Sequence, residues 1–116
     1  MVDDDKLFAW SLERYLLSQG IHTIAVSSGK RAVELAKKVK FDLLFVDYQM
    51  PDMDGIAVAK TIQDTDPEVK TIMISARQRE EIPCEETLLA AYFNKPIDFS
   101  EMKRLLIGMK ILNNGQ

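Results

Sequence analysis

The chain has 116 residues, a length that fits one domain, and a formal net charge of −3. Apolar residues make up 47% and charged residues 28%, a balance that excludes a disordered chain. The acidic charge disfavours a nucleic-acid-binding domain, and the apolar runs are too short to span a membrane. The single cysteine, Cys84, cannot form an internal disulfide. We therefore expect a cytoplasmic protein with no direct nucleic-acid or membrane partner.

The first half of the chain predicts two helices and two strands. Apolar residues at helical spacing predict a helix over residues 6–19. Residues 21–26 are rich in β-branched side chains and predict a short strand. A second helix should follow, capped by Ser27 or Ser28. The nearly continuous apolar run over 41–46 then predicts a strand that is buried on both faces.

The second half continues the alternation. Its expected elements are a loop over 51–55, a helix from there to about residue 64, a strand over 69–74, a helix over 85–91, a very short strand over 92–94 and a helix over 100–112 capped by Ser100. Strands that alternate with helices of this length imply right-handed crossover connections. They predict an α/β fold with a parallel sheet covered on both faces.

Charged and polar side chains follow the expected strands, at the point where each strand ends. They are Asp3, Asp4 and Asp5 near the start, Asp47 after 41–46, Ser75 after 69–74 and Lys95 after 92–94. The carboxyl ends of parallel strands lie along one edge of a sheet, so these groups should converge. Clustered carboxylates repel one another, and Mg²⁺, which prefers oxygen ligands, would relieve that repulsion. A carboxylate in such a site can attack phosphorus and form an aspartyl phosphate.

Four motifs stand at these strand ends. They are Val2-Asp3-Asp4-Asp5, the run Asp-Tyr-Gln-Met-Pro-Asp-Met-Asp-Gly from Asp47 to Gly55, Ile74-Ser75-Ala76 and Asn94-Lys95-Pro96. In this order the chain resembles the chemotaxis-regulator-like receiver domains of bacterial two-component (phosphorelay) response regulators, over essentially its whole length. The resemblance implies a flavodoxin-like, doubly wound parallel sheet of order 2-1-3-4-5 with five helices. It also implies a single receiver domain over 1–116, with no output domain.

The resemblance implies a phosphoacceptor and a metal site. Asp47 would take the phosphoryl group. The cofactor would be Mg²⁺ or Mn²⁺, held by Asp4, by Asp47, by the backbone carbonyl of Gln49 and, through water, by Asp3. Asp52 and Asp54 would then serve in the loop and as helix caps, not as ligands.

The remaining motif residues acquire roles in the same way. Lys95 would pair with a phosphoryl oxygen, and Ser75 would hydrogen-bond the phosphoryl group and move toward it on activation. Tyr92 matches the switch aromatic that turns inward when the hydroxyl residue moves. The peptide bond before Pro96 should be cis. Trp10 lies off the apolar stripe of the first helix, and we hypothesise that it belongs to a surface on which the phosphodonor docks.

These roles describe a signalling switch and not an enzyme with an external substrate, since the domain would assist only its own phosphorylation and dephosphorylation. A histidine kinase or histidine phosphotransfer protein would donate the phosphoryl group. The altered conformation would reach a downstream effector or a covalently attached output domain. An alternative is a receiver-like interaction scaffold that is no longer phosphorylated. An aspartyl-phosphate hydrolase is disfavoured, because Gln49 stands where that class needs a second aspartate.

Two departures from the family pattern need an explanation. Only Met1 and Val2 precede the acidic run, so the first strand is apparently truncated. Loss of a central strand would leave backbone groups unpaired on both neighbouring strands. Either the two residues stand in as a short strand, which we favour, or the chain rearranges or borrows a strand in a homodimer; phosphorylation could also drive dimerisation. The stretch from Ser75 to Lys95 is slightly short and polar, which predicts a short fourth helix.

Overall fold

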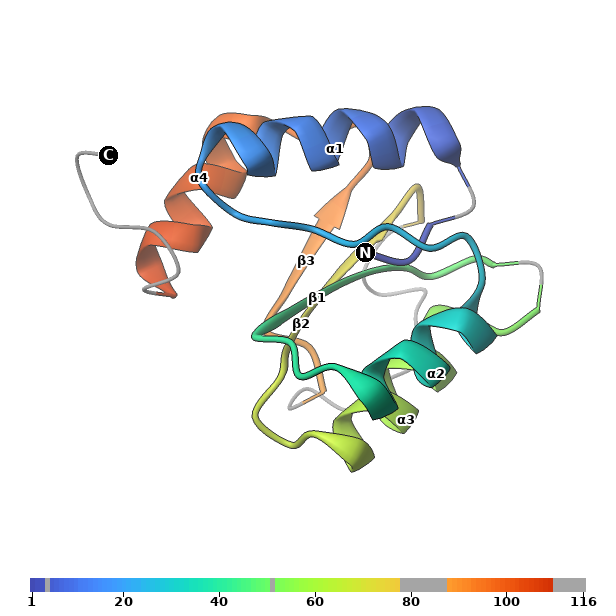
Figure 1. Cartoon of the computed structure of the whole chain (residues 1–116). Helices are drawn as coiled ribbons and strands as arrows, with labels where there is room; N and C mark the ends of the chain where they lie inside the picture. Colours follow the sequence, from blue (N-terminus) through green and yellow to red (C-terminus); the bar gives the residue numbers. More distant parts are fainter. Residues whose placement is uncertain (4, 51, 78–87, 110–116) are drawn as a thin grey trace.

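The computed structural model describes residues 1–3, 5–50, 52–77 and 88–109. Its centre is a parallel sheet of three strands in the order β1-β2-β3 (Figure 1). The strands are β1 (Leu43–Asp47), β2 (Lys70–Ser75) and β3 (Ala91–Asn94). On the free side of β1, Val2 forms parallel bridges with both Val46 and Val26. The order across the sheet is therefore Val26, Val2, β1, β2, β3, which is the expected 2-1-3-4-5 order with its first two strands reduced to single bridges.

The described residues form four helices, which cover the sheet on both faces. They are α1 (Lys6–Ser18), α2 (Gly29–Lys38), α3 (Gly55–Thr65) and α4 (Phe99–Gly108). In Figure 1, α1 and α4 lie on one side of the strands, and α2 and α3 lie on the other. Neighbouring strand residues point to opposite faces. Val46 therefore packs in a cluster with α2 and α3, whereas Phe45 packs in a second cluster with α1 and α4.

Side-chain caps explain where the helices begin. Asp5, Ser28 and Asp54 accept hydrogen bonds from the first-turn N–H groups of α1, α2 and α3. The expected cap Ser28 and the capping role of Asp54 are confirmed. The expected cap Ser100 is wrong, because the carboxylate of Asp98 accepts from the N–H groups of Ser100 and Glu101 and starts α4 earlier. Carboxylates are strong caps, since they satisfy N–H groups that have no partner inside the helix.

Other boundaries also differ from expectation. The predicted strand over 21–26 is reduced to a bridge at Val26, because its partner strand in the sheet is itself only Val2. Residues 85–87 of the predicted helix over 85–91 lie outside the described residues, and its second half is wrong, because residues 88–90 are not helical and β3 begins at Ala91. α4 ends at Gly108, and the rest of the closing helix predicted to 112 falls largely outside the described residues. Within the described part, no helix is long and apolar enough to cross a membrane.

The start of the chain pairs on both sides. The Val2 N–H donates to the Phe45 carbonyl at 2.8 Å, and the Asp47 N–H donates to the Val2 carbonyl at 2.9 Å. On the other side, the Asp3 N–H donates to the Val26 carbonyl at 3.1 Å. Val2 is 2% exposed. Two residues thus stand in for a central strand and deliver Asp3 to the edge where β1 ends.

Candidate functional site

The carboxyl ends of the strands bring the predicted residues to one edge of the sheet. Asp47 is the last residue of β1, and Ser75 is the last residue of β2. Ser75 lies in register with Asn94, the last residue of β3, and Lys95 follows directly. The peptide bond between Lys95 and Pro96 is cis, as expected.

Lys95 lies between two buried carboxylates. Its Nζ is 3.0 Å from Oδ2 of Asp3 and 3.2 Å from Oδ2 of Asp47. Asp3 is 3% exposed and Asp47 is 8% exposed. The Lys95 ammonium also lies 4.4 Å from the centre of the Phe8 ring, in cation–π contact. Three elements that are distant in sequence thus place two negative charges around a single positive one.

This crowding changes the affinity of Asp3 for protons. Burial raises the pKa of the Asp3 carboxyl to about 6, and the nearby charge of Asp47 acts in the same direction. The Asp5 N–H and Lys95 oppose this rise without cancelling it. Burial alone would lower the pKa of Lys95, but the carboxylates of Asp3 and Asp47 outweigh it and the pKa is raised. The site therefore holds more negative charge than Lys95 neutralises.

The donor atoms suit a hard divalent cation. Oδ2 of Asp3 is buried, and the Lys95 ammonium at 3.0 Å is its one contact among the described polar groups. Oδ1 of Asp47 accepts from the Gln49 N–H at 3.2 Å, which folds the Gln49 backbone over the site. Buried carboxylate oxygens with unused lone pairs fit Mg²⁺. Asp4 lies outside the described residues, and within those residues no group of three acidic, histidine or cysteine side chains converges.

Gly55 fixes the loop that follows Asp47. Its N–H donates to the Tyr48 carbonyl at 2.6 Å, so the start of α3 lies against the end of β1. A Cβ at this position would lie 2.3 Å from the Asp47 carbonyl oxygen, a distance at which atoms cannot coexist. The loop is also tied to α2, because Asp52 accepts from the N–H groups of Gly29 and Lys30. Asp52 and Asp54 therefore act as caps, as expected.

A second network surrounds Ser75. This residue is 1% exposed, and its Oγ accepts from the Arg77 N–H at 3.0 Å. The Arg77 carbonyl accepts from the Tyr92 hydroxyl and, at 2.7 Å, from the Asn94 amide. The Gln49 amide, oriented with its oxygen toward Arg77, accepts from Nη2 of that side chain at 2.9 Å. Tyr92 and Gln49 are thus linked to Ser75 through one residue, Arg77.

Trp10 lies near the site and is 56% exposed. The Arg14 guanidinium stacks 5.1 Å from its ring centre. Trp10 also lines a shallow hollow together with Asp3, Lys6 and Arg31. Its exposure agrees with the sequence interpretation, but no contact of the described residues tests the proposed docking role.

Of the predicted site residues, the structure brings Asp3, Asp47 and Lys95 into contact and places Ser75 and Gln49 at the same edge. Sequence reasoning missed the contacts of Phe8 and Asn94. The position of Asn94 next to Lys95 was a usable signal. Phe8 gave none, because its helical spacing marks only a core residue.

Comparisons with known proteins agree with this arrangement. The model of the response regulator receiver domain family matches residues 1–107. The transcriptional regulatory protein ZraR of Escherichia coli K12 is 32% identical over 108 residues, which cover 91% of this chain and 24% of ZraR. The histidine-protein kinase BarA of the same organism is 37% identical over 93 residues, which cover 77% of this chain and 10% of BarA. The chain therefore spans a quarter or less of the length of these curated relatives.

A solved structure extends the comparison to the fold. The receiver domain of a sensor histidine kinase from Pseudomonas aeruginosa PAO1, which carries a magnesium ion in its active-site cleft, superimposes with a TM-score of 0.81. The two chains are 25% identical, and the match covers 92% of this chain and 91% of the other.

Proposed function

Because the chain belongs to the response regulator receiver domain family, we propose that Asp47 accepts a phosphoryl group from a phosphohistidine on a histidine kinase or a histidine phosphotransfer protein. The observation that carries this proposal is the position of Asp47 at the end of β1, with its Oδ2 3.2 Å from the Lys95 ammonium and Asp3 on the other side of that ammonium. The buried Asp47 carboxylate lies beside the Lys95 ammonium, and this positive charge can stabilise the negative charge of a phosphoryl group that is transferred to Asp47.

In this reaction an Asp47 carboxylate oxygen attacks phosphorus, the new O–P bond forms, and the P–N bond to the donor imidazole breaks. Lys95 is placed to pair with a phosphoryl oxygen, because its Nζ already contacts Oδ2 of Asp47. The Gln49 N–H holds Oδ1 and so orients the carboxylate. When bound by Asp4, Asp47 and the Gln49 carbonyl, and through water by Asp3, Mg²⁺ or Mn²⁺ would supply the positive charge that the site lacks.

The network around Ser75 offers a route for switching. If the Ser75 hydroxyl turns toward the phosphoryl group, it gives up the bond from the Arg77 N–H. The Arg77 carbonyl, which holds the Tyr92 hydroxyl and the Asn94 amide, would then shift. Tyr92 is half-buried against the α2–α3 cluster and can report this shift at the surface. An effector protein or an attached output domain would read the change in the cytoplasm. The domain would act on no other substrate.

Binding of an acyl-phosphate analogue tests this function. Beryllofluoride with Mg²⁺ should change the fluorescence of Trp10, which lines the hollow that includes Asp3. The change should need both components and should be lost in Asp47→Asn. Asp64→Asn, an exposed substitution on α3, is the matched control and should respond like the wild type. A wild-type protein without any response would contradict the proposal and favour the scaffold alternative.

A further inference from the structure

The ammonium of Lys95 has three neighbours of two different kinds. Two are the carboxylates of Asp3 and Asp47, with oxygen atoms at 3.0 Å and 3.2 Å from Nζ. The third is the ring of Phe8, whose centre lies 4.4 Å from the same atom. The Lys95 side chain is only 20% exposed, so these neighbours replace most of the water around it. An aromatic ring face attracts a cation, and the attraction is stronger where water is excluded.

A closed network of contacts places Phe8 beside this ammonium. The Asp5 N–H donates to Oδ1 of Asp3 at 2.8 Å, and Oδ1 of Asp5 accepts from the Phe8 N–H at 3.1 Å. Asp5 is the N-cap of α1, so Phe8 lies in the first turn of that helix. Oδ2 of Asp3 contacts Lys95, which completes the network. Figure 1 shows the chain beyond β3 running toward α1, and the network joins these two elements.

Packing alone does not require an aromatic residue at position 8. Phe8 is half-buried at the margin of the cluster that α1 and α4 form. A leucine of similar volume would satisfy helical spacing and apolar burial there. Leucine has no ring face, however, and could not attract the Lys95 ammonium. The contact with Lys95 is therefore the feature that distinguishes phenylalanine from other apolar residues at this position.

Phosphoryl transfer would engage both carboxylates but not the ring. Asp47 would carry the phosphoryl group, and Asp3 and Asp47 would both serve the divalent cation, which prefers oxygen ligands. Each engagement would withdraw negative charge from Lys95. The Phe8 ring is neutral and offers no oxygen, so neither the cation nor the phosphoryl group competes for it. Of the three neighbours, Phe8 is the one whose contact with Lys95 would persist.

We propose that Phe8 is a positioning residue, whose ring face keeps the Lys95 ammonium at the carboxyl edge of the sheet when Asp3 and Asp47 are engaged elsewhere. Phe8 touches no reacting atom and acts only through Lys95. A lysine held in place meets the phosphoryl oxygen without first being ordered. This role in phosphoryl transfer rests on the proposed function, whereas the hold of the ring on the ammonium does not.

The first test observes the contact by NMR without any ligand. The ring current of Phe8 should shift the ε-methylene protons of Lys95 upfield, and the shift should be absent in Phe8→Leu and retained in Phe8→Tyr. It should also persist in the double variant Asp3→Asn, Asp47→Asn, which lacks both carboxylates. Loss of the shift from a folded double variant would overturn the proposal, because the carboxylates alone would then hold the ammonium. Absence of the shift from the wild type would overturn it as well.

The second test measures the contact in the occupied site, through the affinity for beryllofluoride with Mg²⁺ followed by Trp10 fluorescence. Phe8→Leu should bind about fivefold more weakly, as expected for loss of one cation–π contact. Phe8→Tyr keeps the ring face and should bind within about twofold of the wild type. Phe99→Leu is the matched control, because its ring stacks on Tyr15 in the same cluster with a centre distance of 4.5 Å. It should lower stability and leave the affinity unchanged.

The outcomes separate positioning from packing and from the phosphoacceptor function. Unchanged affinity in Phe8→Leu, or equal weakening in Phe8→Leu and Phe99→Leu, would refute positioning by the ring. If the wild type binds no beryllofluoride, the phosphoacceptor function fails. The ligand-free ring-current shift of Lys95 then upholds or overturns the hold of Phe8 by itself.

Discussion

At the scale of single residues, the site is defined by an imbalance of charge. Asp3 and Asp47 are buried on either side of Lys95, and only Lys95 neutralises them among the described contacts. Removing one partner from such a group leaves a buried charge without compensation. The free-energy cost of that charge is larger than the net stabilisation that the intact ion pair provides. We therefore expect Lys95 to stabilise the two buried carboxylates in the absence of any ligand.

Lys95→Met tests this role. The variant should lose about 2 kcal/mol of unfolding free energy at neutral pH, below the usual cost of breaking a fully buried pair because Lys95 is partly exposed. Urea denaturation measures the loss. Mg²⁺ should restore part of it. Lys60→Met, an exposed substitution on α3, is the control and should change stability little. Equal stability of Lys95→Met and the wild type would contradict the charge imbalance.

Asp3 should make stability depend on pH. Its pKa rises from 3.8 in the unfolded chain to about 6 in the folded protein, so the folded state binds the proton more tightly. The free energy of unfolding should therefore fall as pH rises from about 4 to 6 when no divalent cation is present. Burial of the Met1 amine lowers its pKa from 8.0 to about 6. The free energy of unfolding should therefore rise as pH increases from about 6 to 8, because the unfolded chain binds this proton more tightly.

Asp3→Asn should remove the fall in unfolding free energy between about pH 4 and 6. It should keep the rise between about pH 6 and 8, which comes from the Met1 amine. Thermal unfolding at a series of pH values, with and without Mg²⁺, measures both. Mg²⁺ should also flatten the acidic side in the wild type, because a bound cation favours the ionised carboxylate. An unchanged acidic slope in Asp3→Asn would assign that slope to another group.

At the scale of elements, the packing of β1 against the start of α3 positions the carboxylate of Asp47. Gly55 allows that approach, since any Cβ would collide with the carbonyl of Asp47 and with Cα of Tyr48. In the loop between β1 and α3, the Asp52 carboxylate accepts from an N–H at the start of α2, and the Asp54 carboxylate accepts from an N–H in the first turn of α3. These bonds fix the loop to both helices.

Gly55→Ala should displace this loop. We expect a loss of about 2 kcal/mol or more in unfolding free energy, as for overpacking against a rigid backbone. Beryllofluoride binding should weaken as well, because the Gln49 backbone moves with the loop. Gly108→Ala is the matched control: no atom lies within 4 Å of its added Cβ, and the helical position should gain slightly from alanine. A tight, wild-type response to beryllofluoride in Gly55→Ala would argue against this role.

The sequence predicted the elements more accurately than their limits. The pattern of apolar residues predicted α1, α2, β1, α3 and β2, and the motifs correctly predicted that Asp47, Ser75 and Lys95 lie at the carboxyl ends of strands. The sequence did not predict the early start of α4. Asp98 and Ser100 are both suitable N-cap residues, and only the hydrogen bonds of the folded chain show that Asp98 is the cap. The loss of the strand over 21–26 also could not be read locally, because a strand needs a partner and here the partner is Val2 alone.

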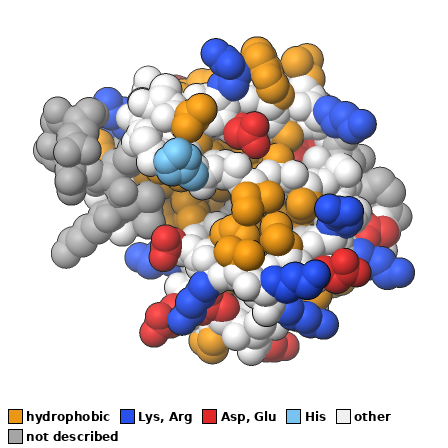
Figure 2. Space-filling view, viewed as in Figure 1, with side chains coloured by type: hydrophobic (Ala, Val, Ile, Leu, Met, Phe, Trp, Pro, Cys, Tyr) orange, Lys and Arg blue, Asp and Glu red, His pale blue; other side chains and the backbone are white. Residues whose placement is uncertain are grey.

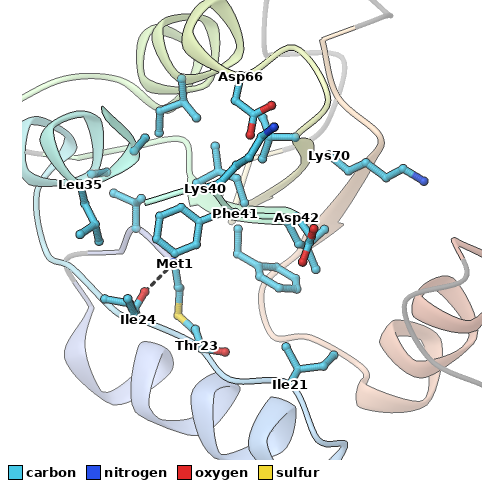
Figure 3. Close-up of a pocket in the computed structure, with 18 of the residues that line it drawn as sticks. Met1, Ile21, Thr23, Ile24, Leu35, Lys40, Phe41, Asp42, Asp66 and Lys70 are labelled. Carbon is cyan, nitrogen blue, oxygen red and sulfur yellow. Dashed lines mark hydrogen bonds between the residues drawn. The ribbon is translucent and has the colours of Figure 1, made fainter. Parts of the chain in front are cut away.

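At the scale of the whole molecule, the two edges of the sheet have different properties. The carboxyl edge gathers charge around Lys95, and the amino edge is a cleft lined mainly by apolar side chains (Figure 2 and Figure 3). Residues 1–3 connect the two edges, because Met1 lines the cleft, Val2 bridges both neighbouring segments and Asp3 contacts Lys95.

The proposed function requires that Asp47 becomes phosphorylated. The direct measurement is transfer from an unlabelled phosphohistidine donor in the presence of Mg²⁺, followed by reduction with tritiated borohydride, which releases the phosphate and leaves tritium on the reduced side chain, and then by peptide mapping. We predict one tritium label that maps to the peptide containing Asp47, requires Mg²⁺ and disappears in Asp47→Asn. Label that persists in Asp47→Asn, or that maps to a peptide without Asp47, would contradict this account.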